Sequence, residues 1–302
     1  MNGDTTMDKQ RPDEIEFLAS YDVSQFERPS LTVDMLIFTI TDEDTGNYRK
    51  LPQKVLKLLL VKRGVHPFMG KWALPGGFIR MEESLDEAAA RELKSETNID
   101  NIYMEQLYTW GDVKRDPRTR VISCSYLALI DSESLEVKPG DDADDAKWLE
   151  VSYRIDGEQR LDIENGYVSE TLSSIDLKDK NDAIFARIKT TTTVNGKVTS
   201  TKSEILESNG LSFDHAKMIV YAIERLKNKL EYTDIVFSLM KDKFTLTELQ
   251  QVYEVILGKE QLAANFRRKI AHMVTETEEY TKDAGHRPSK LFRFNPEWKK
   301  KL

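Results

Sequence analysis

The segment from Gly77 to Ile99 constrains the fold of this 302-residue chain more than any other part of the sequence. It begins in a loop rich in glycine and proline and continues into a helix, because Ser84 and Glu87 form the pattern of a capping box. Within that helix Glu92 and Glu96 are four residues apart, so both carboxylates project from one face. Carboxylates at this spacing are common on solvated helices, so only the spacing of the whole segment gives them a functional meaning.

The spacing of this segment resembles the Nudix box. That motif has a glycine, five residues, a glutamate, seven residues, Arg-Glu, an aliphatic residue, any residue, Glu-Glu, any residue, a glycine and an aliphatic residue. The chain departs from it at Ser95, which replaces the first glutamate of the pair, and at Asn98, which replaces the glycine. The resemblance predicts a Nudix domain that holds a nucleoside diphosphate compound. The matching positions are Gly77, Glu83, Arg91, Glu92, Leu93, Glu96 and Ile99.

The resemblance implies roles for four charged residues of the box. Glu92 and Glu96 are the expected catalytic carboxylates and the ligands of Mg²⁺ or Mn²⁺. Arg91 orients them by ion pairing, and Glu83 supports the geometry of loop and helix. Hard oxygen ligands suit these cations, which neutralise charge on a pyrophosphate and activate a water molecule. Because Ser95 supplies a neutral oxygen in place of a carboxylate, we expect a metal site that is weak or absent, and hydrolysis stays open.

A second segment, residues 111–121, resembles the ligand loop of ADP-ribose-type Nudix proteins, in which arginine and an Asp-Pro pair meet the ligand. Its cations are Lys114, Arg115, Arg118 and Arg120. Two interpretations of them are open, a cluster that binds a diphosphate or the polar tip of a β-hairpin, and the adjoining box favours the first. The expected ligand-binding residues are Gly76, Gly77, Arg80, Arg115, Asp116 and Arg118.

From Asp214 onward the apolar residues repeat at helical spacing. The first helix is amphipathic, and three interpretations of it are open: a domain connector, a dimerisation helix or a core helix. A second capping box, Thr245 to Glu248, opens a later helix that Gly258 ends. Helices followed by a hairpin, in this order, are typical of a winged helix-turn-helix. The predicted elements are helices over 216–230, 245–257 and 261–274, a short apolar stretch over 235–240 and a hairpin over 275–294.

The charge distribution is compatible with a DNA-binding end. The formal net charge of −8 argues against nucleic-acid binding, but residues 261–302 contain ten Lys or Arg and five Asp or Glu. A basic end on an acidic body suggests an anionic partner, although a solvated lysine-rich tail gives the same count. Arginine pairs with guanine edges in the major groove, and wing cations contact phosphates. The expected DNA-binding residues are Arg267, Arg268 and Lys269 on the third helix and Arg287, Lys290 and Arg293 on the wing. The alternative is a winged helix used for protein contact.

A Nudix domain followed by a winged helix is similar to the Nudix-related transcriptional regulators of bacterial NAD metabolism and sugar catabolism. Residues 213–215, 244–248, 265–269 and 285–294 carry the C-terminal part of this resemblance. In that family the Nudix domain senses ADP-ribose or a relative, the winged helix binds DNA, and weakened boxes are frequent. The wing of that family usually contains Gly-Arg-Pro, whereas His286 intervenes here.

The sequence thus predicts an α+β protein with an N-terminal Nudix α/β/α sandwich and a C-terminal winged helix-turn-helix. Neither a membrane span nor a signal peptide is apparent, and the single cysteine, Cys124, is expected to be buried, so the expected location is the cytoplasm. The expected segments are a flexible tail over 1–20, the Nudix domain over 21–152, an insertion or connector over 153–212 with a β-hairpin at Asn195-Gly196, and a linker helix with the winged helix over 213–302.

Two functions are compatible with this organisation. The first is a ligand-responsive bacterial transcriptional regulator whose partners are an ADP-ribose-like small molecule and double-stranded operator DNA. It would act as a homodimer, because paired half-sites mirror a two-fold axis. The second is a Mg²⁺-dependent Nudix hydrolase of the ADP-ribose pyrophosphatase type that cleaves a nucleoside diphosphate-linked substrate. Ser95 argues against fast hydrolysis, and a plain hydrolase has little use for residues 214–294, so we favour the regulator.

Overall fold

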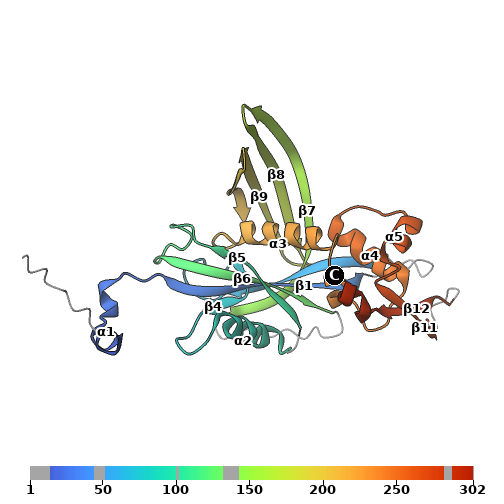
Figure 1. Cartoon of the computed structure of the whole chain (residues 1–302), viewed down its shortest axis with the longest axis horizontal. Coiled ribbons are helices and arrows are strands. Elements are labelled where there is room, and N and C mark those ends of the chain that lie inside the picture. The colour runs from blue at the N-terminus through green and yellow to red at the C-terminus, as the bar shows by residue number, and fades with distance from the viewer. Residues whose placement is uncertain (1–13, 44–51, 100–101, 132–142, 282–287, 302) are drawn as a thin grey trace, which may run out of the picture.

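The computed structural model describes residues 14–43, 52–99, 102–131, 143–281 and 288–301 (Figure 1). Its strands in the large sheet are β1 Ser30–Glu43, β2 Gln53–Arg63, β3 Trp72–Ala73, β4 Gly76–Phe78, β5 Tyr103–Trp110, β6 Val121–Ile130, β7 Ala143–Ile163, β8 Gly166–Lys178, β9 Ala183–Asn195 and β10 Val198–Asn209. They form one ten-stranded sheet in the order β10-β9-β8-β7-β2-β1-β6-β5, with β3 beside β2 and β4 beside β1. The central pair β1 and β6 is parallel, while the other main-path pairs are antiparallel.

The central strand β1 is buried on both faces of the sheet. Its side chains alternate, so Leu36 and Phe38 join one hydrophobic cluster while Met35 and Ile37 join another. This double burial explains why the strand is an almost continuous apolar run in the sequence. Helix α2, Leu85–Thr97, covers one face, and α3, His215–Lys229, with α4, Leu246–Leu257, covers the other (Figure 1). The predicted α/β/α sandwich is confirmed.

Helix α3 is a core helix. Its residues Met218, Ile219, Ala222, Ile223 and Leu226 are buried in the same cluster as the sheet residues that face it. That cluster continues without a break into α4 and the C-terminal helices. Of the three interpretations that the sequence left open, the packing therefore supports a core helix. One hydrophobic core spans the boundary between the two predicted domains.

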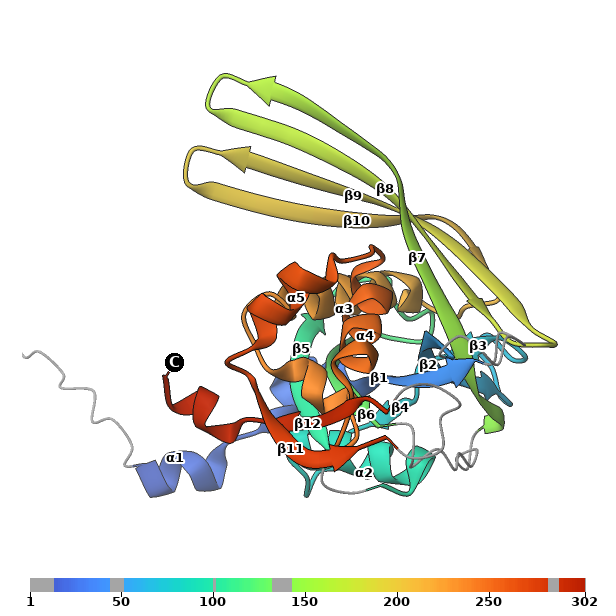
Figure 2. The ribbon, with the colours of Figure 1, turned by 90° about the vertical axis from the view of Figure 1, so that its right-hand side faces the viewer.

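The segment between the two predicted domains is part of the large sheet. Strand β7 does not end with the expected Nudix domain at residue 152 but continues to Ile163, and β8 returns beside it, so the segment holds two hairpins where the sequence predicted one. The hairpin at Asn195-Gly196 is present as predicted, with Gly196 at φ 58°. The four strands extend beyond the helices (Figure 2). The outer part of β7 is exposed, so it lacks the apolar alternation by which a half-buried strand is predicted.

The C-terminal part has the order of a winged helix. The 3-10 helix η3, Ile235–Leu239, precedes α4, and α5, Ala263–Ile270, is followed by the antiparallel strands β11, Val274–Tyr280, and β12, Lys290–Phe294. A last 3-10 helix, η4, spans Pro296–Lys301. The third helix is shorter than the predicted 261–274, because a turn closes after Ile270 and Val274 already pairs with Phe294. Phe266 and Ile270 of α5 are buried, and so is Met273, which follows the helix.

Most of the tail expected over 1–20, residues 1–13, lies outside the described part of the chain. Residues 14–20 form a short helix, α1, Glu14–Ser20, whose side chains are all exposed, and a 3-10 helix, η1, Val23–Gln25, follows. Cys124 is buried as predicted. None of the helices in the described part of the chain has both the length and the apolar character that a bilayer crossing requires.

Candidate functional site

Helix α2 begins and ends as its sequence predicts. The hydroxyl of Ser84 accepts from the backbone N–H of Glu87 at 3.2 Å, and the Glu87 carboxylate accepts from the backbone N–H of Ser84 at 2.7 Å. At the other end Asn98 takes the left-handed conformation, with φ 55°. The replacement of the family glycine by asparagine at this position is therefore compatible with the helix end.

Arg91 ties the loop to the helix. Its guanidinium donates to both carboxylate oxygens of Glu83, at 2.9 and 2.6 Å, and also pairs with Glu92 at 2.5 Å. The hydrogen bonds from Arg91 lower the pKa of Glu83 to about 2. Glu83 thus holds Arg91, and Arg91 in turn holds one of the two carboxylates that the box presents.

Two glycines allow the loop to approach its neighbours closely. A Cβ on Gly76 would collide with the backbone oxygen of Val33, because β4 lies directly against β1. A Cβ on Gly77 would collide with the carboxylate of Glu92. The Glu92 carboxylate therefore lies directly against Gly77, while Gly76 permits the close approach of β4 to the backbone of β1.

A cavity of about 470 Å³ lies between the box helix, the glycine loop, the loop 111–120 and the start of α3. Every predicted ligand-binding residue lines it, and so do Arg91, Glu92 and Glu96, whereas Glu83 is not among the lining residues. Ser95 lines it too, as its position beside Glu92 predicts. Sequence reasoning missed the other lining residues, and those with charged, imidazole or aromatic side chains are Asp34, Lys62, Arg63, Phe78, Phe213 and His215.

The cations of the loop 111–120 divide into two groups. Arg115 and Arg118 line the cavity, but Lys114 and Arg120 do not, and the Arg120 guanidinium donates to the backbone oxygen of Asp112 at 3.2 Å. Arg118 pairs with Asp116 at 2.8 Å, and its side chain is 42% exposed. The pKa of Asp116 is lowered, because the hydrogen bonds and charge of Arg118 outweigh the effect of burial. Half of the predicted cation cluster therefore faces the cavity.

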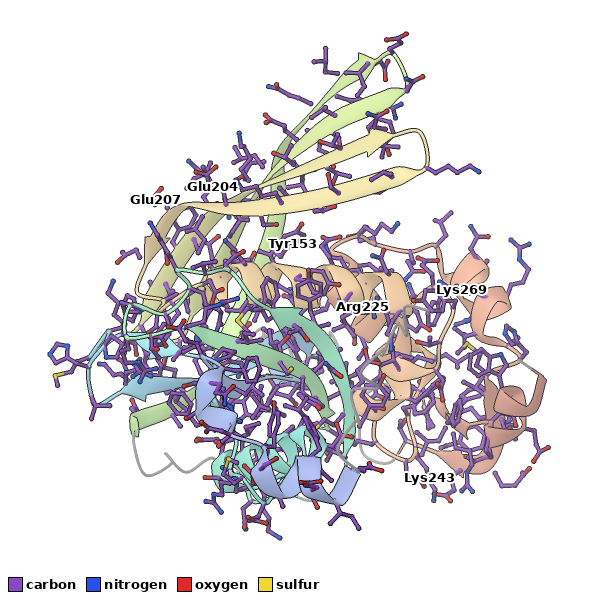
Figure 3. The ribbon with its side chains drawn as sticks, turned by 60° about the vertical axis from the view of Figure 1, so that its left-hand side comes forward. Tyr153, Glu204, Glu207, Arg225, Lys243 and Lys269 are labelled. Carbon is purple, nitrogen blue, oxygen red and sulfur yellow. The ribbon has the colours of Figure 1, made fainter. Side chains whose placement is uncertain are left out.

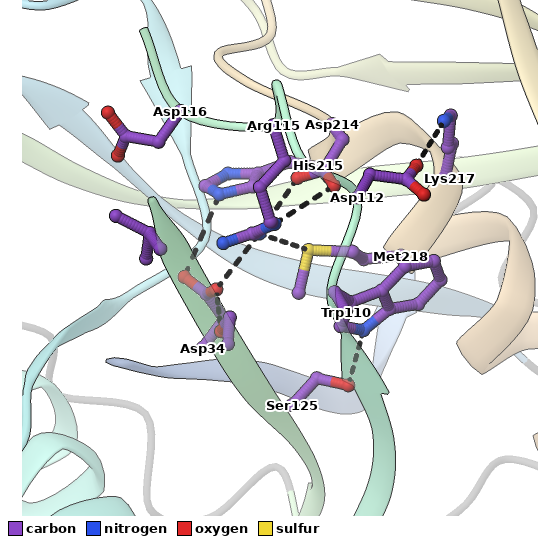
Figure 4. A network of polar contacts seen from close by, with 12 residues as sticks. Asp34, Trp110, Asp112, Arg115, Asp116, Ser125, Asp214, His215, Lys217 and Met218 are labelled. Atoms are coloured by element: carbon purple, nitrogen blue, oxygen red, sulfur yellow. Dashed lines mark hydrogen bonds and ion pairs between the residues drawn. The ribbon is translucent and has the colours of Figure 1, made fainter. Parts of the chain in front are cut away.

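Arg115 is held between two aspartates (Figure 4). Its Nη2 and Nε donate to the two carboxylate oxygens of Asp214, at 2.8 and 3.1 Å, and Nη2 lies 3.7 Å from Asp34. His215, next to Asp214, accepts from the backbone N–H of Leu74 at 2.9 Å through Nδ1. Burial lowers the pKa of His215, so its imidazole is neutral. Phe213 and His215, which the sequence assigned to the C-terminal domain, thus line the Nudix cavity, and Asp214 between them pairs with the lining residue Arg115.

The box residues offer a partial site for a divalent cation. Glu92, Ser95 and Glu96 line the cavity together, which gives two carboxylates and a hydroxyl. Among the described residues no group of three His, Cys, Asp or Glu side chains is placed to hold a metal ion. Mg²⁺ is commonly bound by one or two carboxylates together with phosphate oxygens and water. The donor set therefore fits one cation that shares its ligands with a bound phosphate compound, and it does not form a complete protein cage.

The predicted DNA-binding side chains lie in different surroundings. On α5, Arg267 and Arg268 are exposed. The Nζ of Lys269 lies 3.3 Å from the carboxylate of Glu231 and 5.3 Å from the centroid of the Tyr253 ring. On the wing, Arg293 is exposed, and Lys290 pairs with Glu276 at 2.6 Å. The prediction for Arg287 lies outside the described residues. Asn265, exposed on α5 and able to read an adenine edge, was not among the predicted residues.

Fold and cavity together define a class of protein in which a Nudix domain and a winged helix share one chain. The family described as "NUDIX domain" matches residues 31–153, and the one described as "NrtR DNA-binding winged helix domain" matches residues 236–294. The chain is 32% identical to the ADPR responsive transcriptional repressor NtrR of Acinetobacter baylyi over 281 residues, which cover 92% of this chain and 87% of the relative. The chain therefore belongs to the NrtR family of Nudix-related transcriptional regulators.

Other similarities agree with this assignment. A MutT/nudix family protein from Enterococcus faecalis is similar in structure, with a TM-score of 0.66, 28% identity and 95% of each chain covered. Shewanella oneidensis NrtR complexed with a 27mer DNA has a TM-score of 0.57, 28% identity and coverage of 89% of this chain and 94% of that one. The ADP-ribose pyrophosphatase of Methanocaldococcus jannaschii is 39% identical over 100 residues, 33% of this chain and 58% of the relative.

Proposed function

We propose that this protein is a ligand-responsive transcriptional regulator. Its Nudix cavity binds ADP-ribose or a related nucleoside diphosphate compound, and its winged helix binds double-stranded operator DNA as part of a homodimer in the cytoplasm. The observation that carries the proposal is the joint presence, over most of the chain, of a Nudix cavity and an NrtR-type winged helix. The name of the A. baylyi relative, an ADPR responsive repressor, supports the same conclusion.

The chemistry of the cavity suits a diphosphate with aromatic and sugar parts. Arg80 and Arg118 line it and are suited to phosphate oxygens, since guanidinium groups bind phosphates bidentately. The rings of Phe78 and Phe213 line it as well and offer apolar surface for a nucleobase. A volume of about 470 Å³ falls within the range of roughly 300–1,000 Å³ for small-molecule sites.

Calorimetric titration of the full chain with ADP-ribose tests the ligand. We expect one site per chain, and we expect Arg118→Ala to bind about tenfold or more weakly, because hydrogen bonds to charged groups contribute about 1.5–3 kcal/mol. Arg160→Ala is the matched control, since Arg160 lies on the exposed outer part of β7. Absence of ADP-ribose binding, or equal losses in the two variants, would contradict the proposed ligand site.

The alternative function is hydrolysis of an ADP-ribose-type substrate. The two carboxylates of Glu92 and Glu96 and the similarity to an archaeal ADP-ribose pyrophosphatase favour it. Incubation of the protein with ADP-ribose and Mg²⁺, followed by measurement of AMP, separates the two functions. Turnover within the range of about 1–10³ per second that is typical of enzymes would support the hydrolase and contradict a pure sensor.

A further inference from the structure

Asp214 occupies a capping position without capping its helix. It is the N-cap residue of the fifteen-residue helix α3, and aspartate is among the preferred N-cap residues, but its side chain makes no capping hydrogen bond. Its backbone is not extended either, with φ −98° and ψ 18°. The capping residues Ser84 of α2 and Thr245 of α4 have ψ values of 168° and 155°. The start of α3 therefore differs from the starts of α2 and α4 in two ways: its N-cap side chain makes no capping hydrogen bond, and its N-cap backbone is not extended.

The carboxylate of Asp214 is instead committed to Arg115. Both of its oxygens accept from that guanidinium, and the two side chains are only 9% and 5% exposed. Arg115 belongs to the ligand loop, whereas Asp214 begins the helix that leads to the winged helix. This buried ion pair thus joins a residue that lines the cavity to the first turn of α3 (Figure 4).

An anionic ligand disturbs the charge balance around this pair. Arg115 faces two carboxylates, those of Asp34 and Asp214, and the adjacent His215 is neutral. A diphosphate entering the cavity adds further negative charge and competes for Arg115. Asp214 has a second kind of partner, since the backbone N–H groups of the first turn, here those of Ala216 and Lys217, are the usual donors to an N-cap side chain. The N–H of Lys217 now donates to the backbone oxygen of Asp214 at 2.9 Å, so it would have to exchange that acceptor for the carboxylate.

Exchange of partners would require a change in backbone shape. To cap α3, Asp214 has to rotate ψ from 18° toward the extended values seen at Ser84 and Thr245. The preceding residue, Phe213, holds φ 49°, a left-handed conformation that is strained for a bulky side chain. Phe213 also lines the cavity. The Cζ atoms of Arg63 and Arg118 lie over its ring, 5.1 and 5.9 Å from the ring centroid. Rotation at Asp214 would therefore move this wall of the cavity and the start of α3 together.

We propose that Asp214 exchanges partners when the cavity is filled. Without ligand it pairs with Arg115; with ligand, the phosphates draw Arg115 away and Asp214 turns to cap α3. The inference rests on the proposed function, because it names how occupancy of that same cavity is passed on. Helix α3 shares one core with α4 and α5, so a shift at its start reaches the DNA-binding helix.

The variant Asp214→Asn tests the exchange in the full chain. Asparagine caps helices well but cannot form the charged pair with Arg115. We expect the ligand-free variant to bind operator DNA with the affinity that wild type shows only when saturated with ADP-ribose. The response to ADP-ribose should shrink to less than about 2-fold, from a wild-type coupling of about 5- to 150-fold. By reciprocity, the variant should bind ADP-ribose more tightly than wild type.

The matched control is Asp112→Asn. Asp112 pairs with Lys217 at 3.2 Å, so it joins the same loop to the same helix, but it is exposed and does not line the cavity. This variant should keep the full response. An equal loss of response in the control would show that any loosening of the loop uncouples the domains, which contradicts a specific exchange.

A crystal structure of the full wild-type chain with ADP-ribose tests the partner exchange of Asp214 without depending on how well the variant folds. We expect the Asp214 carboxylate at hydrogen-bond distance from the backbone N–H of Ala216 or Lys217, and Arg115 on the phosphates. Persistence of the Arg115–Asp214 pair in that complex, or an unchanged response of Asp214→Asn, overturns the exchange while the proposed function stands. A wild-type protein that binds no ADP-ribose overturns the proposed function itself.

Discussion

At the scale of single residues, Glu83 shows how a side chain outside the cavity shapes the site. It lies behind Arg91, which it holds by two hydrogen bonds, and Arg91 then pairs with Glu92 at the cavity wall. The box spacing therefore also places a chain of charged side chains that runs from Glu83 through Arg91 to Glu92. The role that the family resemblance implied for Glu83, support of the loop–helix geometry, is compatible with this arrangement.

The pairing of Glu83 predicts a dependence of stability on pH. Hydrogen bonds from Arg91 lower its pKa from 4.5 to about 2, so the folded state favours the charged form. The stabilisation is fully present above pH 4.5 and is lost as the pH falls toward about 2. In thermal unfolding, Glu83→Gln should have a lower Tm than wild type at neutral pH, and the difference should shrink across this window. A difference that does not change with pH would contradict the charged pairing, and Glu82→Gln, at an exposed neighbour, is the control.

The residue contacts that the sequence could not predict are those between distant segments. Arg115 was predicted to face the ligand, and it does line the cavity, but its partner Asp214 lies 99 residues further along the chain. Local patterns such as a capping box depend on near neighbours and are readable in the sequence. A buried ion pair depends on how the helix α3 docks on the sheet, which no local pattern specifies.

At the scale of elements, predictions held where near neighbours decide the structure. The capping boxes of α2 and α4 each depend on residues three positions apart, and both helices are present. The hairpin of β7 and β8 was missed, because the outer part of β7 is exposed and carries no apolar alternation. The edge strand β10 bears the acidic side chains Glu204 and Glu207, which lie away from Lys269 of α5 (Figure 3).

The recognition helix α5 permits a matched comparison of two adjacent cations. Arg268 is exposed, whereas Lys269 is engaged by Glu231 and the ring of Tyr253. We expect Arg268→Ala to weaken operator binding by about 1–3 kcal/mol, roughly 5- to 150-fold, if it pairs with a base edge. Lys269→Ala should change DNA affinity much less. Fluorescence anisotropy with a labelled duplex measures both, and the opposite order of effects would contradict this orientation of α5.

At the scale of the whole molecule, the two domains are not separate bodies joined by a linker. Helix α3, which the sequence grouped with the C-terminal domain, covers the Nudix sheet, and one hydrophobic cluster includes both Leu58 of that sheet and Ile256 of α4. Of the residues just before α3, Phe213 lines the cavity, and Asp214 pairs with Arg115, which lines it too. A shared core of this kind gives a change in the cavity a physical route to the winged helix.

The most direct test of the central claim is the affinity of the full chain for DNA with and without ADP-ribose. The probe is a labelled duplex from the region upstream of its own gene, at fixed salt, since DNA affinity depends strongly on ionic strength. We predict specific binding whose Kd changes by about 5- to 150-fold on saturation with ADP-ribose. A mixture of AMP and ribose 5-phosphate should leave the Kd unchanged. An identical Kd with and without ADP-ribose, or binding without sequence preference, would contradict a ligand-responsive regulator.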